Sequence, residues 1–168
     1  RKFHCYNHKV HGNVSLEDSL AYSCNKSFSN IGTKLDMDAL NKLCGDFLYN
    51  KELPYDGYYK KSSYTMTSKT DKSLIPQTVI GQGETLITPL HNAMIMCAIA
   101  NGGVLMKPYM MDRIENCDGS VVTKFSKDSN GRIISSAEAQ TLTELMMSVT
   151  EYGTASDYFS GAEYTVAG

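Results

Sequence analysis

The sequence predicts an α-dominated α+β fold with one β-hairpin and short strand stubs. Three observations support this prediction: a long apolar segment between a helix-start and a helix-stop signal, further segments with apolar residues at helical spacing, and an Asp-Gly pair between two apolar runs. The chain has 168 residues, of which 42% are hydrophobic and 20% charged. Such a composition is that of a globular protein with a core, formed by one domain or by part of one.

Residues 89–100 are predicted to form the central helix, around which the rest of the chain packs. Thr88 is a suitable N-cap, and the ring of Pro89 presets φ for the first helical position. The segment carries no charge, and a helix that is apolar on all sides is a buried one. Asn101-Gly102-Gly103 then stop the helix, because glycine adopts the left-handed conformation without steric cost. The run is shorter than the roughly twenty residues that span a bilayer, so we expect a core helix followed by a strand at 104–106.

Three further helices are predicted from their start signals. Ser15 and Asp36 are good N-caps, and acidic residues follow Ser15, where they complement the helix dipole. Ser135 and Glu138 form the S-x-x-E pattern of a capping box. Apolar residues then recur at the 3.6-residue spacing of an amphipathic helix. After Asp36 they are Ala39, Leu40, Leu43, Cys44, Phe47 and Leu48, and after Ser135 they are Leu142, Leu145, Met146 and Val149.

The remaining segments are predicted to be strands or loops. Asp118-Gly119 between apolar runs is the strongest short-range signal for a hairpin, so we expect strands at 110–115 and 121–125. Residues 163–167 are predicted to form another strand. From 50 to 79 no apolar period is visible, and we expect a surface excursion packed by its own tyrosines. Irregular segments of this length are uncommon inside domains and are often functional.

Charge argues against a nucleic-acid partner, and cysteine spacing reveals no disulfide-rich scaffold. The net charge is −2 and the longest basic run is Lys60-Lys61, so no nucleic-acid partner is expected. The five cysteines are odd in number, widely spaced and without a CxxC motif, so they reveal no disulfide framework. Cys44 and Cys97 fall at core-facing helix positions, where a free cysteine acts as a small hydrophobe. Both chain ends look cut, and we expect a fragment of a longer protein.

The first twelve residues contain three of the four histidines. His4, Cys5, His8 and His11 offer imidazole and thiolate groups, which are zinc ligands. Their spacing is not that of a known zinc finger, and four ligands so close in sequence require the loop to fold tightly on itself. We therefore expect a polar loop with no metal and no cofactor. A small metal-binding protein remains an open alternative.

The segment Ser23-Cys24-Asn25-Lys26 carries the candidate chemistry. It is predicted to lie in a tight polar turn between two short helices, which holds the Ser23 and Asn25 side chains outside a helical ladder. S-x-N is a weak motif by itself, but its predicted position in a turn between two helices makes a functional role more plausible than the sequence match alone does. We expect the Ser23 hydroxyl and the Asn25 carboxamide to project together from a corner that leans on the helix at 89–100.

A longer run that includes this turn points to a known family. The run 11–28, HGNVSLEDSLAYSCNKSF, resembles the segment around the second catalytic motif of penicillin-binding protein transpeptidase domains. The later landmarks, which follow in the family's order, are Gly81-Gln82-Gly83-Glu84, Thr88-Pro89-Leu90, Ala100-Asn101-Gly102-Gly103, Lys107-Pro108, Gly153-Thr154-Ala155 and Val166-Ala167-Gly168. His91 and Met96 stand where the family more often has Gln and Tyr, and we expect them to affect packing alone.

The resemblance implies both a fold and site residues. Residues 1–168 would form a partial transpeptidase domain, the helical part of a serine transpeptidase/β-lactamase-like α/β domain. The family uses three motifs, S-x-x-K, S-x-N and K-T-G, and only S-x-N is placed here. Ser23 would belong to the proton relay around the nucleophile and its lysine. Asn25 would bind a substrate amide or position that lysine.

The resemblance also implies a reaction and a location. A serine ester would form on a peptidoglycan stem peptide ending in D-Ala-D-Ala, and a neighbouring amine would resolve it, cross-linking the wall. β-Lactams would acylate the same serine. We expect an extracytoplasmic site in the bacterial envelope, with the membrane anchor outside this chain. The fragment alone is expected to be inactive, and an uncovered apolar face makes self-association an expectation.

Two further alternatives remain open. Ser23-x-x-Lys26 also matches S-x-x-K, in which case Ser23 would be the nucleophile and Lys26 its base. A non-catalytic helical scaffold or interaction module also fits, because the chain holds no complete catalytic set. A reading frame with S-x-x-K upstream and K-T-G downstream would exclude the scaffold.

Overall fold

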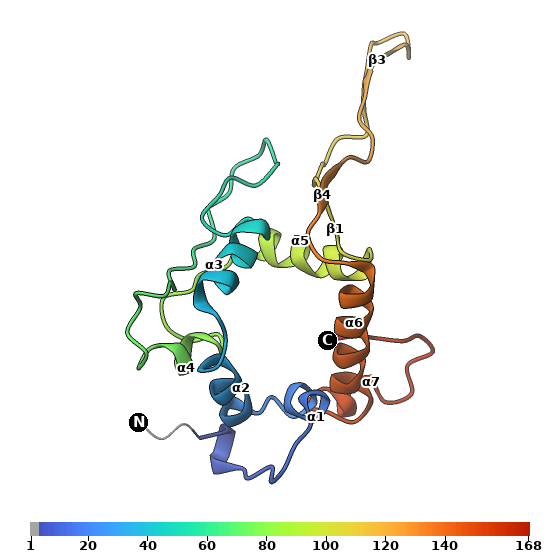
Figure 1. The fold of residues 1–168 in the computed structure, drawn as a ribbon. Coiled ribbons are helices and arrows are strands. Elements are labelled where there is room, and N and C mark those ends of the chain that lie inside the picture. Colours follow the sequence, from blue (N-terminus) through green and yellow to red (C-terminus); the bar gives the residue numbers. More distant parts are fainter. Residues whose placement is uncertain (1–3) are drawn as a thin grey trace.

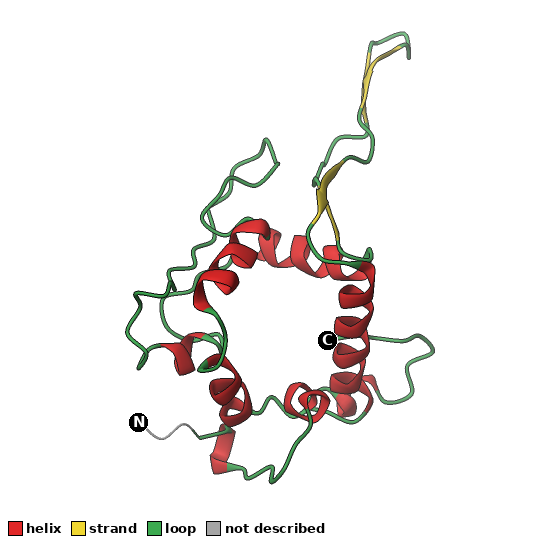
Figure 2. Cartoon of the chain, viewed as in Figure 1, coloured by secondary structure: helices red, strands yellow, loops and turns green. Residues whose placement is uncertain are grey.

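The computed structural model describes residues 4–168, which form a ring of helices from which a long β arm and several loops project (Figure 1). Helices make up most of the ring, and the strands lie in one long arm (Figure 2). The helices are η1 (Tyr6–His8), α1 (Leu16–Ala21), α2 (Asn25–Gly32), α3 (Met37–Asp46), α4 (Ile75–Thr78), α5 (Pro89–Ala100), α6 (Ser136–Glu151) and α7 (Ser156–Phe159). The strands are β1 (Val104–Met106), β2 (Arg113–Glu115), β3 (Val121–Lys124) and β4 (Ser129–Arg132). The α-dominated prediction is confirmed.

The predicted helix starts are confirmed at their capping residues. The Ser15 hydroxyl accepts a hydrogen bond from the Asp18 N–H at 3.0 Å, and the Asp18 carboxylate accepts one from the Ser15 N–H. The same reciprocal capping box joins Ser135 and Glu138 at the start of α6. The Asp36 carboxylate accepts from two N–H groups in the first turn of α3. These caps satisfy N–H groups that have no partner within their own helix.

Helix α5 has the predicted boundaries but not the predicted surroundings. Its buried residues are His91, Met94 and Ala98. Met96 is 39% exposed, and Cys97 is exposed as well. The prediction that this helix is buried on all sides is therefore wrong, as is the core position of Cys97. The physical reason is that α6, β1 and the segment that follows α3 cover the face of His91, Met94 and Ala98, whereas no described helix or strand covers the face of Met96 and Cys97.

Two small clusters form the core. The first contains Leu48, Leu53, Met94, Ala98 and Leu105, and the second contains Met37, Tyr64, Met66 and Ile75. Four of these nine residues come from the irregular segment 50–79, so this segment is not the surface excursion that we predicted. It contains α4 and a bridge between Ser63 and Leu86. Single large side chains of this irregular segment therefore pack into the core, where a regular helix or strand is the more usual source of such contacts.

The strands differ in part from the prediction. Strands β2 and β3 pair antiparallel across Asp118-Gly119, with Ile114 opposite Thr123, which confirms the hairpin. Strand β1 forms as predicted and pairs with β4, which the sequence pattern did not reveal. No strand forms at 163–167 in the described structure. This prediction is wrong, because no described strand lies beside the segment to supply the ladder of hydrogen bonds that a strand needs.

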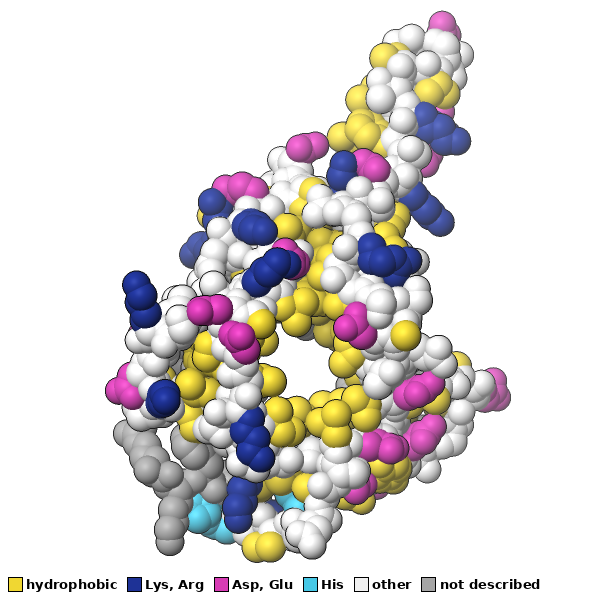
Figure 3. Space-filling model, in the orientation of Figure 1, with side chains coloured by type: hydrophobic (Ala, Val, Ile, Leu, Met, Phe, Trp, Pro, Cys, Tyr) yellow, Lys and Arg dark blue, Asp and Glu magenta, His cyan; other side chains and the backbone are white. Residues whose placement is uncertain are grey.

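The ring encloses an opening bordered by hydrophobic side chains (Figure 3). Partly exposed apolar residues occur on the helices around it: Leu43 on α3, Met96 on α5 and Leu142 on α6, with exposed fractions of 40%, 39% and 36%. Helix α6 closes one side of the ring by packing against α1, α5 and α7. Among residues 4–168, none of the helices has the length and apolar content needed to cross a lipid bilayer.

Candidate active site

The predicted polar turn lies between α1 and α2. The Ser23 N–H donates to the Leu20 carbonyl at 3.0 Å, and the Cys24 N–H donates to the Ser19 carbonyl at 2.8 Å. Ser23 has a φ of 50°, in the left-handed region that residues other than glycine enter uncommonly. Its side chain is exposed. The sequence therefore builds a tight corner that presents one hydroxyl to solvent, as predicted.

A hydrogen-bonded pair of serines, one buried and one partly buried, holds the two helices beside this turn. Ser19 on α1 is 1% exposed, and its hydroxyl donates to the Ser15 carbonyl at 2.6 Å. The Ser27 hydroxyl on α2 lies 2.7 Å from the Ser19 hydroxyl. Because buried hydroxyls are stable only when hydrogen-bonded, the pair fixes the angle between the helices. Sequence reasoning missed it, although a serine on the apolar face of α1 was the available signal.

Asn25 is the first residue of α2 and is partly buried. Its Nδ2 donates to the His4 carbonyl at 3.2 Å. A carboxamide has two N–H donors and one acceptor oxygen, so among residues 4–168 one N–H and the oxygen remain for another partner. The segment that carries His4 thus supports the predicted site residue from outside the turn.

Lys26 is the second residue of α2 and is exposed. Ser23 precedes the helix by two residues, so Ser23 and Lys26 are not one turn apart on the same helix. That helical arrangement is what a spacing of three residues normally serves. The geometry disfavours the alternative in which Ser23 is a nucleophile with Lys26 as its base.

The turn is backed by α6 and the residues after it. The Thr154 N–H donates to the Ala21 carbonyl at 2.9 Å. A Cβ atom on Gly153 would lie 2.3 Å from the same carbonyl oxygen, so only glycine permits this approach. The Tyr152 hydroxyl donates to the Glu17 carboxylate at 3.1 Å. Residues 152–154 therefore hold α1 in place directly before Ser23.

The expectation that the corner leans on the helix at 89–100 is wrong. Helix α1 packs against α6 and α2, and α2 packs against α4. Figure 1 shows α1 and α2 across the ring from α5. Helix α6 spans the distance between α5 and α1, so it is the element against which the corner rests. His91 of α5 is fully buried, with Nε2 at 2.5 Å from the Phe47 carbonyl, consistent with a packing role.

Cys24, the middle residue of the turn, faces inward. It is 5% exposed, and burial raises the pKa of its thiol, opposed by backbone hydrogen bonds. The donor atoms of Cys5, His11 and Cys24 all lie within 4.8 Å of one another. The sequence interpretation considered His4 and His8 with Cys5 and His11. The structure brings Cys24 into this group instead, and sequence distance had concealed it.

All residues from 1 to 168 match the family model described as the penicillin-binding protein transpeptidase domain. The chain belongs to this family. The resemblance in the sequence is thereby confirmed, and so is the fold class.

Two curated transpeptidases are similar in sequence. Peptidoglycan D,D-transpeptidase PbpA of Mycolicibacterium smegmatis is 29% identical over 138 residues, covering 82% of this chain and 28% of that protein. PbpA of Mycobacterium tuberculosis is 31% identical over 134 residues, covering 80% of this chain and 27% of that protein. The chain therefore spans little more than a quarter of the length of these relatives.

Solved transpeptidase structures share the fold. Penicillin-binding protein A of M. tuberculosis, as a penicillin G acyl-enzyme complex, aligns with a TM-score of 0.81 at 29% identity, covering 87% of this chain and 34% of that one. The D,D-transpeptidase domain of a peptidoglycan glycosyltransferase from Eggerthella lenta aligns with a TM-score of 0.82 at 24% identity, covering 96% and 42%. The second match supports the fold alone. The roles of Ser23 and Asn25 remain predictions.

Proposed function

We propose that this chain is part of a peptidoglycan D,D-transpeptidase that cross-links stem peptides ending in D-Ala-D-Ala and is acylated by β-lactams. One observation carries the proposal: Ser23 and Asn25 flank an inter-helical turn, with the Ser23 side chain exposed, on a scaffold similar to that of a penicillin G acyl-enzyme. Residues 1–168 form one partial domain of this enzyme. The reaction proceeds through a serine ester, whose formation releases the terminal D-Ala.

The two site residues have different roles in this proposal. The Ser23 hydroxyl can both accept and donate a hydrogen bond. It therefore passes a proton between the lysine beside the nucleophilic serine and the leaving or attacking amine. Asn25 donates its remaining N–H to a substrate amide or orients the lysine beside the nucleophile. The His4 carbonyl holds the other N–H of the carboxamide, which fixes the plane of the group before substrate binds.

The parent protein acts outside the cytoplasm, on peptidoglycan in the bacterial envelope, with its membrane anchor outside residues 1–168. Nucleic acid is not a partner in this proposal. Residues 1–168 contain no K-T-G sequence, and S-x-x-K occurs once, at Ser23–Lys26, so the isolated chain is inactive. The apolar residues around the opening lead it to self-associate. A shift to larger species with rising concentration in analytical ultracentrifugation tests this, and a monomer at every concentration contradicts it.

Acylation by a fluorescent penicillin tests the assignment in the protein that carries this segment. Ser23→Ala and Asn25→Ala are expected to slow acylation by about 10²–10⁴-fold, the range for groups that transfer protons or stabilise charge. Lys26→Met is the matched control and keeps the rate. Unchanged acylation in both site variants would contradict the roles assigned here. A label mapped to Ser23 itself would establish the S-x-x-K alternative.

The second candidate function, a non-catalytic helical scaffold, predicts a different result. The parent protein would then take up no penicillin into a serine ester, and Ser23→Ala would have no effect on any covalent adduct. Mass spectrometry of the protein after incubation with penicillin G distinguishes the two functions, because only a transpeptidase gains the mass of the ring-opened drug.

A further inference from the structure

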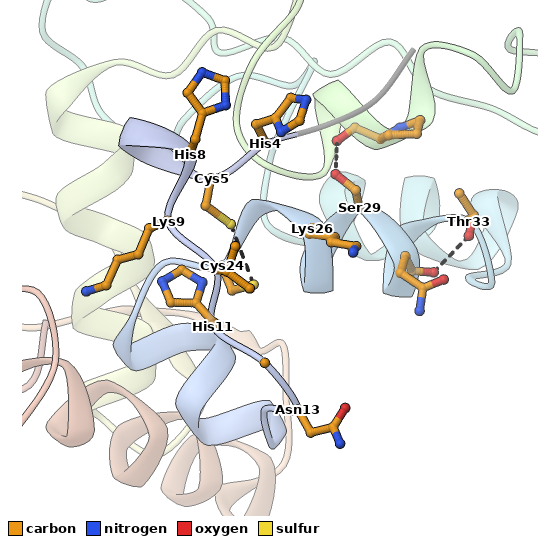
Figure 4. A pocket seen from close by; sticks show the side chains of 14 residues that line it. His4, Cys5, His8, Lys9, His11, Asn13, Cys24, Lys26, Ser29 and Thr33 are labelled. Atoms are coloured by element: carbon orange, nitrogen blue, oxygen red, sulfur yellow. Dashed lines mark hydrogen bonds between the residues drawn. The ribbon is translucent and has the colours of Figure 1, made fainter.

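Three potential metal ligands converge behind the S-x-N turn. The Sγ atoms of Cys5 and Cys24 are 3.8 Å apart, and a ring nitrogen of His11 completes a group whose members lie within 4.8 Å of one another. Figure 4 shows the Cys5 sulfur pointing toward Cys24, with the His11 ring beside them. Two cysteines and one histidine from different parts of the chain therefore lie side by side. An ordinary polar loop has no need of such an arrangement.

The sulfur separation fits a tetrahedral zinc site and is too long for a disulfide, although two thiols in contact also lie at this distance. Zn–S bonds are about 2.3 Å long, so two thiolates on one tetrahedral ion lie about 3.8 Å apart. A disulfide instead holds its sulfurs at about 2.05 Å. The distance between Cys5 Sγ and Cys24 Sγ, 3.8 Å, matches the first arrangement and not the second.

Burial gives a second, independent indication. Cys5 and Cys24 are 9% and 5% exposed. The Nδ1 atom of His11 is buried and makes no hydrogen bond to any residue in the described range 4–168. An unsatisfied buried nitrogen is unfavourable, and coordination to a cation removes that penalty. The neighbouring Tyr22 ring stacks on His11 at 5.8 Å between centroids and fixes its orientation.

We propose that Cys5, His11 and Cys24 bind one Zn²⁺ ion, whose fourth coordination position is open to water. The ring nitrogens of His4 and His8 do not belong to the converging group, although both residues line the adjoining pocket together with Lys9. Three protein ligands and one exchangeable position form a complete tetrahedral set. Binding releases the two thiol protons, because thiolates are the ligands.

The ion has a positioning role in this proposal. Cys24 stands between Ser23 and Asn25 and is the N-cap residue of α2, so a bond from Cys24 to the ion anchors the turn to the segment that contains Cys5 and His11. The same segment already supports Asn25 through the His4 carbonyl. The ion thus ties the S-x-N turn to residues 4–11 without touching a substrate.

Metal content of the untagged protein that carries this segment, purified with a phosphine reductant and Zn²⁺ and then desalted, tests the proposal. We expect one zinc per chain by plasma mass spectrometry. With Co²⁺ we expect thiolate-to-cobalt charge-transfer absorption and the visible bands of a tetrahedral site. Cys5→Ala, His11→Gln and Cys24→Ser are each expected to weaken Zn²⁺ binding by more than about 100-fold, since loss of a direct ligand exceeds the effect of losing a second-layer partner.

Matched controls come from the same chain. Cys97→Ser and Cys117→Ser remove exposed thiols and keep the zinc. His11→Gln lies in the loop before α1 and leaves the helices intact, so loss of zinc there with unchanged circular dichroism supports the site rather than a folding defect. Wild type gains thermal stability with Zn²⁺, and His11→Gln does not.

Two results would overturn the proposal. The first is wild-type chain without stoichiometric zinc under reducing conditions, or with zinc that all three ligand variants retain. The second is a Cys5–Cys24 disulfide that forms in the presence of excess Zn²⁺, detected by intact mass after alkylation. Either result is independent of penicillin acylation, so this proposal and the proposed function fail separately.

Discussion

Helices α5 and α6 meet at one corner of the ring and differ in how closely their burial follows their sequence pattern. Helix α6 reads as amphipathic, buries Ala139, Ser148 and Thr150, and packs against three other helices. Helix α5 is apolar on every side, yet it exposes Met96 and Cys97. The comparison teaches that apolar content sets how much surface a helix needs to bury, whereas the neighbouring elements decide how much it does bury.

Gly103, which follows α5, offers the strongest test of this corner. It has a φ of 90°, and an added Cβ would lie 2.1 Å from the Ile134 carbonyl oxygen. Left-handed strain and overpacking add, so Gly103→Ala is expected to lower the free energy of unfolding by about 3 kcal/mol or more. Urea denaturation measures it. Gly102→Ala is the control, since its Cβ would meet only a serine side-chain oxygen at 3.8 Å. An equal loss of stability in this control would show that the contact with the Ile134 carbonyl does not destabilise the Gly103 variant.

Gly153, which follows α6, provides the matching test at the other end of the comparison. Its φ is not in the left-handed region, but a Cβ would approach both the Ala21 oxygen and the Val149 backbone. Gly153→Ala is expected to cost about 2 kcal/mol through backbone displacement. It should also displace the Ser23 turn and slow penicillin acylation in the parent protein. Loss of stability with an unchanged acylation rate would show that α6 does not position the turn.

Ser19→Ala tests the hydrogen-bonded contact between α1 and α2. The change removes one partner of the partly buried Ser19–Ser27 pair and leaves the Ser27 hydroxyl without this partner, for an expected loss of about 1–2 kcal/mol. The double variant Ser19→Ala with Ser27→Ala should recover part of it. A double-mutant cycle by thermal unfolding measures the coupling, and strict additivity would mean that the two hydroxyls do not interact.

Thiol reactivity gives the smallest expected effect and contrasts α5 with α3. Cys97 on α5 is exposed, whereas burial raises the pKa of the Cys44 thiol to about 11. Cys97 should react first with iodoacetamide at pH 8, in the chain with the other thiols replaced. The folded state keeps the Cys44 proton after the unfolded chain has lost it. This contribution to stability is therefore complete below the unfolded-state pKa of 9.0 and is lost as pH rises toward 11. Equal alkylation rates would contradict the assigned burial.

Much of the fold was predictable because it depends on neighbours in sequence. The caps at Ser15, Asp36 and Ser135 and the Asp118-Gly119 turn involve residues two to four positions apart, and all are confirmed. Strand β4 was not predictable, since Ser129–Arg132 is polar and is a strand only through its pairing with β1. The burial of segment 50–79 was missed for a related reason: its apolar residues have no period and reach the core singly.

In the candidate site, too, local features were predictable from the sequence and contacts between distant residues were not. The turn that presents Ser23 follows from the helices on either side of it and was predicted. Its supports come from far along the chain: the His4 carbonyl, residues 152–154 and the Cys5–His11–Cys24 group. A single sequence contains no record of such contacts, so the corner was placed against α5, where the longest apolar run stands, rather than against α6.

The contact between Tyr152 and Glu17 joins residues 135 positions apart, and this has a consequence for synthesis of the protein. The ribosome releases α1 and the serine turn long before it releases the end of α6, because chains emerge at about 5–20 residues per second. Until then α1 has no surface against which to rest, and loop closure over such a distance is slow. Nascent chains halted before residue 152 should therefore carry an unlocked turn that proteases cut readily.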